Sequence, residues 1–223
     1  MRMKKFMMIA AMMVAAVTAN AQFEPGTFSI QPKAGFSVAW MTNMPKIPIS
    51  ASKSIDKSPV VGAVIGAEAE YQITDMFSLA AGLNYSLQGS GWENYSEGGV
   101  ELKDAQIELG YFTIPVVANF YLFKGFAIKA GIQPGFLTNA KMKYKIEGKS
   151  SEGNLGIDFD KSIKDDCEKF DLSVPMGVSY QFRVPVVVDL RYNLGVSKIF
   201  KGSGDENSKN NVVQLTVGYK FAL

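Results

Sequence analysis

The feature that most constrains the fold is an alternation of apolar and polar residues that continues over most of the chain. Between Thr27 and Met41, almost every second residue is apolar and those between are polar or glycine. Side chains of a β-strand point alternately to its two faces, so this pattern predicts a strand with one apolar face. Seven further segments show it: 61–71, 77–88, 107–122, 126–136, 171–182, 186–197 and 213–221. The sequence therefore predicts an all-β chain of eight antiparallel strands.

The connections between these segments alternate in length. Short ones are predicted at Thr74–Met76, Phe123–Gly125 and Arg183–Pro185. Long ones are predicted at Asn43–Pro59, Gly89–Gln106, Asn139–Lys169 and Ile199–Asn211. Outer-membrane barrels show this asymmetry, with short turns on the periplasmic side and long loops outside. We therefore expect an up-and-down transmembrane β-barrel with both chain ends on the short-turn side.

Alternation alone does not say which face points outward, because a soluble barrel around a ligand also alternates. The predicted strands of about 12 residues are longer than most soluble strands and suit the roughly 9–11 residues of a membrane-crossing strand. Aromatic residues of the apolar face also gather near the strand ends, as at the two interfaces of a bilayer. These are Tyr71, Phe77, Phe120, Phe126, Tyr180, Phe182, Tyr219 and Phe221 near the short turns, and Trp40, Tyr85 and Phe136 near the long loops.

The polar face carries charges that a lipid-facing surface would not tolerate. They are Lys33, Glu68, Glu70, Lys129, Asp171, Asp189, Arg191 and Lys220. A basic side chain facing lipid near the bilayer midplane costs about 2–4 kcal/mol, whereas four bases and four acids inside a barrel could pair with each other. We expect a charge network in the lumen; the alternative is the solvated face of a soluble sandwich.

The N-terminus predicts export. Arg2, Lys4 and Lys5 precede an apolar run from Phe6 to Val17, and the small-residue sequence Ala19-Asn20-Ala21 follows. This order is typical of a secretory signal peptide, here residues 1–21, and the run is short for a membrane-spanning helix. A buried N-terminal helix is the alternative. Residues 22–223 are then the barrel domain, which we expect in the outer membrane of a Gram-negative-type cell after general secretory export.

Composition excludes several classes of function. Without residues 1–21 the chain has 20 basic and 21 acidic residues, a net charge of −1, which gives nucleic acid no basic surface. Histidine is absent, which removes every mechanism that needs an imidazole. We expect no enzyme, cofactor or metal. The single cysteine, Cys167, excludes an internal disulfide and is either a chance residue of a polar loop or an intermolecular contact.

Four short motifs resemble those of a known family. Residues 111–115 (YFTIP), 130–136 (AGIQPGF), 189–195 (DLRYNLG) and 217–221 (VGYKF) are similar to PorT-like outer-membrane β-barrels, although Thr113 stands where members often have glutamate. The resemblance spans nearly all of residues 22–223. It implies outer-membrane lipid and lipopolysaccharide as surroundings, and a final strand read by the barrel-assembly machinery. Some members are linked to protein secretion across the outer membrane.

Function is the least determined property. Side chains nearly fill an eight-stranded barrel, so we expect a structural role or interactions made by the loops. A narrow porin-like channel, favoured by inward glycines, and an accessory role in outer-membrane secretion are the alternatives.

The candidate loop contacts are Trp92, Tyr95, Lys141, Lys143 and Lys145. Apolar residues alternate with these three lysines, so they either extend a hairpin beyond the membrane or bind lipid-A phosphates. Trp92 is either an interfacial anchor or, with Tyr95, a contact for a glycan or a protein. The nearby aspartates lack the spacing of an EF-hand calcium loop.

Overall fold

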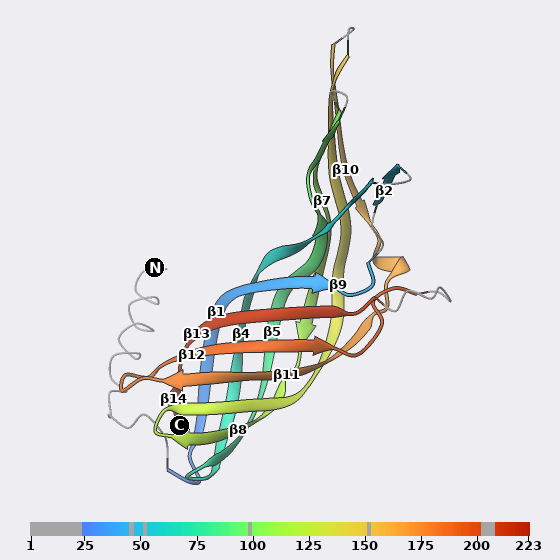
Figure 1. Ribbon diagram of the computed structural model, residues 1–223. Helices are drawn as coiled ribbons and strands as arrows, with labels where there is room; N and C mark the ends of the chain where they lie inside the picture. Colours follow the sequence, from blue (N-terminus) through green and yellow to red (C-terminus); the bar gives the residue numbers. More distant parts are fainter. Residues whose placement is uncertain (1–23, 45–46, 51–52, 98–99, 151–152, 202–207) are drawn as a thin grey trace, which may run out of the picture.

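The computed structural model describes residues 24–44, 47–50, 53–97, 100–150, 153–201 and 208–223, and most of them lie in β-strands (Figure 1). The wall strands are β1 (Phe28–Met41), β4 (Lys57–Thr74), β5 (Phe77–Trp92), β7 (Val100–Thr113), β8 (Val116–Phe123), β9 (Phe126–Ser150), β11 (Phe170–Gln181), β12 (Val186–Gly195), β13 (Asn210–Tyr219) and β14 (Phe221–Ala222). The other elements are β2 (Ile47–Ser50), β3 (Lys53–Ile55), β6 (Tyr95–Glu97), β10 (Gly153–Ser162) and the 3-10 helix η1 (Lys164–Asp166). The expected signal peptide lies outside the described residues.

The strands pair antiparallel and close into a barrel, as predicted. From β1 the order is β4, β5, β7 with β8, β9, β11, β12 and β13, which pairs with β1 again. The strand number differs from the predicted eight: over the described ranges, the closed sheet holds twelve strands. The wall has eight positions, but Ile114–Pro115 splits one into β7 and β8, and Lys220 splits another into β13 and β14. Proline has no N–H for the hydrogen-bond ladder, which explains the break between β7 and β8. The remaining two of the twelve strands, β6 and β10, pair outside the wall.

The two faces of the wall point as predicted. Phe36, Ile65 and Leu190 lie on the outer surface with 69%, 62% and 47% of their area exposed. Lys33 and Glu68, from the same strands as Phe36 and Ile65, are buried in the lumen. This arrangement is the reverse of a soluble barrel, because the apolar side chains form the outside and the charges the inside.

The short turns lie where they were predicted, and aromatic side chains flank them. Beside these turns, the rings of Phe123 and Phe126 stack with centroids 4.9 Å apart, and Tyr180 and Phe182 pack edge to face at the same distance. Much of the predicted long connections 89–106 and 139–169 is strand, and in 139–169 this agrees with the predicted hairpin extension. The apolar and polar alternation continues through these segments, and β7, β9 and β10 consequently pair beyond the barrel.

These extensions form what we call the protruding sheet: β6, residues 100–108 of β7, residues 141–150 of β9, and β10. It rises from the long-connection end of the barrel (Figure 1). Its polarity is inverted relative to the wall. On the outer face the apolar Phe112 and Phe136 give way to Glu108 and Lys141, while the lumen face becomes apolar. A bulge at Asp104, whose φ is +52°, adds one residue to β7 relative to β9. Lys103 and Gln106, on either side of the bulge, therefore lie opposite Lys145 and Lys143 and point to the same face.

An apolar cap fills the barrel mouth beneath the protruding sheet. Its buried members are Met41, Met44, Ile55, Trp92, Ala105, Ile107, Leu109, Tyr111, Leu137, Ala140, Cys167 and Ile199. They come from the upper ends of the wall strands and from the connections above them.

Within the described ranges, no helix has the length and apolarity that crossing a bilayer requires.

Candidate functional site

Five of the predicted lumen charges meet in one group, which we call the ion cluster: Lys33, Glu68, Lys129, Asp189 and Arg191. The Arg191 guanidinium donates to both oxygens of Glu68, at 2.8 and 3.3 Å, and to both oxygens of Asp189, at 3.2 and 2.8 Å. Lys33 Nζ lies 2.5 Å from Glu68, and Lys129 Nζ lies 2.5 Å from Asp189. Three cations and two carboxylates thus pair with one another across β1, β4, β9 and β12.

A second group lies nearer the short turns. Lys220 Nζ is 2.8 Å from a Glu70 carboxylate oxygen, and the hydroxyls of Tyr121 and Ser78 donate to the other oxygen at 2.6 and 2.7 Å. Asn119 in turn donates to Ser78 at 3.0 Å. The signal that could have identified Tyr121 was its place on the inner phase of β8, where its hydroxyl satisfies a buried carboxylate.

The eighth predicted lumen charge, Asp171, belongs to neither group. It is buried on β11 and accepts a hydrogen bond of 2.6 Å from the Ser197 hydroxyl. Neutral polar side chains also line the lumen between the ion cluster and the apolar cap, including Asn84, Gln88 and Asn193. Apart from Asp171, the lumen thus changes from ionic near the short turns to neutral and then apolar at the mouth.

Two of the inward glycines lie against side chains of neighbouring strands. A Cβ built on Gly82 would lie 2.5 Å from Cγ of Glu68, and one built on Gly218 would lie 2.6 Å from Nε2 of Gln31. Side chains from neighbouring strands therefore occupy the space beside these two glycines. At these two positions the geometry does not favour the interpretation of the glycines as openings for a narrow channel.

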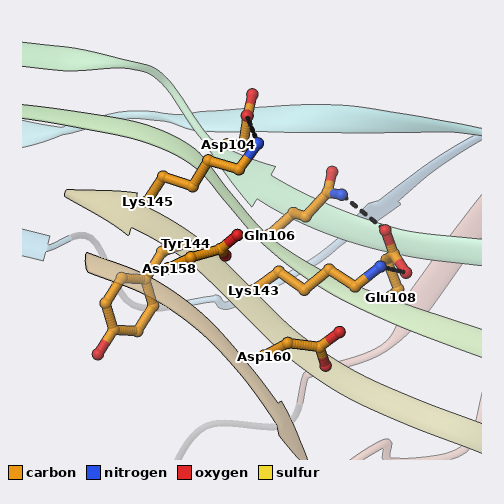
Figure 2. Close-up of a pocket in the computed structure, with 8 residues that line it drawn as sticks. All are labelled: Asp104, Gln106, Glu108, Lys143, Tyr144, Lys145, Asp158 and Asp160. Atoms are coloured by element: carbon orange, nitrogen blue, oxygen red, sulfur yellow. Dashed lines mark hydrogen bonds and ion pairs between the residues drawn. The ribbon is translucent and has the colours of Figure 1, made fainter. Parts of the chain in front are cut away.

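The predicted lysines lie on the outer face of the protruding sheet and are paired with acids. Lys141 Nζ is 3.2 Å from Asp160, Lys143 Nζ is 2.7 Å from Glu108, and Lys145 Nζ is 3.2 Å from Asp104. Figure 2 shows this face around a hollow of about 700 Å³. The Glu108 carboxylate raises the pKa of Lys143 by hydrogen bonding to its ammonium. A hairpin extension explains these lysines better than a phosphate site, because each already has a carboxylate partner.

The two predicted aromatic contacts lie on strands rather than on an open loop, with Trp92 buried and Tyr95 half-buried. Trp92 ends β5 and is buried in the apolar cap, and Tyr95 on β6 packs against it. The burial of Trp92 follows from its position at the mouth, where the inner face turns apolar. Trp92 also lines a hollow of about 320 Å³ on the inner face of the protruding sheet, with Leu102, Met142 and Ile146.

Cys167, predicted to be a chance residue of a polar loop or an intermolecular contact, is buried in the apolar cap. It pairs with Phe200 in an isolated bridge, and burial raises the pKa of its thiol to about 11. Only the thiolate reacts readily, so we expect a water-soluble maleimide at pH 8 to label the folded protein at least 100-fold more slowly than the urea-unfolded protein. Mass spectrometry of timed samples measures both rates. Equal rates would show that this cap opens freely.

Comparison with known proteins gives a family and several similar folds. The family model described as "Outer membrane protein beta-barrel domain" matches residues 20–201. Ail, the attachment invasion locus protein of Yersinia pestis, solved with the heparin analogue sucrose octasulfate, is 15% identical, with a TM-score of 0.47 over 88% of this chain and 99% of that one. OprG from Pseudomonas aeruginosa is 11% identical, with a TM-score of 0.45 over 92% and 99%. A search of curated protein sequences finds no significant match.

Proposed function

The chain belongs to the outer membrane protein β-barrel domain family, and from that premise we propose that it is a closed, non-catalytic barrel that presents the protruding sheet outside the cell as an interaction surface. Short turns of such barrels face the periplasm, which directs the protruding sheet outward. Export by a cleaved signal peptide of residues 1–21 is part of this proposal, as is assembly through the final strand, where Phe221 pairs with Ile30.

The single observation that carries the proposal is a lumen spanned by the ion cluster and capped by apolar side chains, beneath a projecting sheet. The ion cluster joins both walls of the lumen through Arg191, and the apolar cap fills the mouth. An ion crossing the barrel would have to break buried, mutually hydrogen-bonded charges and then pass an apolar layer. The exposed protruding sheet, in contrast, offers both charged and apolar groups to a partner.

Reconstitution into planar lipid bilayers tests the proposal. We expect silence at 100 mV and 1 M KCl from protein whose folded state is verified by heat-modifiable migration on a denaturing gel. The double variant Lys33→Ala with Arg191→Ala is compared with the unaltered protein in the same bilayer assay, because it removes two side chains that fill the lumen. Stable unitary conductance of the unaltered protein would contradict the closed barrel and favour the porin-like alternative.

A more specific assignment within the family is also proposed. The motifs 111–115, 130–136, 189–195 and 217–221 support placing the chain among PorT-like barrels. Within that group, we propose an accessory role in outer-membrane secretion. A closed barrel suits this role better than that of a conduit, because the ion cluster obstructs the path of a cargo chain through the lumen. Deletion of the gene followed by profiling of secreted proteins tests this assignment: a normal profile would contradict it.

A further inference from the structure

We propose that the free edge of β10 binds an extended peptide segment of another protein in which basic and apolar residues alternate. The inference rests on the proposed function, since it names the partner of the protruding sheet. In the part of the chain that the structure describes, β10 is the last strand of the sheet order and pairs with β9 alone. An unpaired strand edge offers alternate backbone N–H and C=O groups to an added strand.

The side chains of β10 determine which strand would fit. On one face stand Asp158 and Asp160, both exposed, with Asp160 also 3.2 Å from Lys141 Nζ, and on the other stand Ile157 and Phe159. Residues directly opposite in an antiparallel pair point to the same face. A strand added to this edge therefore has to place bases beside the two aspartates and apolar groups beside Ile157 and Phe159.

The existing partner of β10 already shows this pattern. In the observed register, Lys145 lies opposite Asp158, Tyr144 opposite Phe159 and Lys143 opposite Asp160. The Tyr144 and Phe159 rings stack with centroids 4.5 Å apart. The β9 segment around Tyr144 is thus a template for what the free edge of β10 accepts on its other side.

A second copy of this chain fits the edge poorly. Antiparallel pairing of two β10 strands centred on Phe159 would bring Asp158 of each copy opposite Asp160 of the other. Like charges directly opposite each other destabilise a strand pair, so the aspartates disfavour self-association and select a basic partner. The apolar hollow beside Trp92, on the face that Tyr144 and Phe159 share, extends the surface available to the partner's apolar side chains.

A fluorescent peptide with the sequence of residues 141–149 (KMKYKIEGK) tests the inference, with the full-length barrel in lipid nanodiscs and fluorescence anisotropy as the readout. We expect saturable binding that weakens as salt rises from 50 to 500 mM. The double variant Asp158→Asn with Asp160→Asn should weaken binding at least tenfold. The matched control, Asp165→Asn with Asp166→Asn, removes two exposed charges from η1 and should stay within twofold.

Two altered peptides separate strand addition from simple charge attraction. Glutamates in place of the lysines corresponding to 141, 143 and 145 should weaken binding at least tenfold, and so should proline in place of the residue corresponding to 144. Ile157→Lys is a second protein variant, with the same expected loss, should the aspartate variant fail to fold. Equal binding to all variants, equal binding of the proline peptide, or dimerisation through β10 in sedimentation experiments would overturn the inference.

The outcome is separable from that of the proposed function. A silent barrel that ignores the peptide would refute the edge inference alone. A barrel that conducts in bilayers would refute the closed-barrel proposal, whatever the peptide does.

Discussion

Replacing Glu68 by glutamine should destabilise the barrel by about 3–5 kcal/mol, the cost expected when one partner of a buried ion pair is removed. Glu68 is the carboxylate shared by Lys33 and Arg191, and Lys129 lies 4.0 Å from it. Without it, three buried cations would share one carboxylate, that of Asp189. Urea unfolding in lipid vesicles, followed by tryptophan emission, measures the change in the free energy of unfolding.

Arg191→Met is the matched control for this prediction. It also removes one charge from the ion cluster, but it leaves Lys33 paired with Glu68 and Lys129 paired with Asp189. We expect a loss of about 1–2 kcal/mol, since every remaining charge keeps a partner and methionine fills much of the volume. Equal losses for the two variants would show that the balance of charge in the lumen does not govern stability.

Arginine in place of Leu190 should cost about 2–4 kcal/mol, because Leu190 lies in the middle of β12 on the surface that faces lipid. Ile157→Arg is the control, since Ile157 has nearly the same exposure, 46% against 47%, but lies on the protruding sheet in water. We expect the control to change stability by less than about 1 kcal/mol. The same unfolding assay in vesicles compares the two variants.

Equal effects at Leu190 and Ile157 would contradict the membrane boundary assigned here. That boundary lies where the outer face of β7 and β9 changes from Phe112 and Phe136 to Glu108 and Lys141. A large loss of stability for Ile157→Arg would place the membrane boundary higher on the protruding sheet. A small cost at Leu190 would place the barrel wall in water.

Much of the barrel could be predicted from the sequence because each strand reports its own two faces. A strand has a period of two, so the phase of alternation in residues 27–41 already separates Phe36 from Lys33. Tyr111 and Tyr121 interrupt the alternation in residues 107–122, since both are apolar rings buried on the otherwise polar inner face. Tyr111 packs in the apolar cap, and Tyr121 lies beside Glu70. The alternation of polarity alone did not indicate to which face of the wall these two side chains point.

The candidate sites were harder to predict, since they depend on residues far apart in the chain. Arg191 and Glu68 are separated by 123 positions, and only the register from β1 through β12 brings them together. The burial of Cys167 and Trp92 likewise depends on where the connections cross the mouth. The alternation of Lys141, Lys143 and Lys145 with apolar residues indicated a hairpin extension in 139–169, but which strands flank it on either side depends on pairing that the sequence does not give.

The sequence by itself determined that this chain forms antiparallel strands with one apolar and one polar face, because strand alternation is local. Strand length, the aromatic residues at the strand ends and the charges of the polar face favoured a barrel with its apolar side chains outward. The tertiary structure alone decided which carboxylates bind Arg191 and which apolar side chains lie at the barrel mouth. It also decided that β7, β9 and β10 continue into a sheet with inverted polarity. The physical reason is that register and closure are collective: a side chain's partner is set by hydrogen bonding between strands around the whole ring.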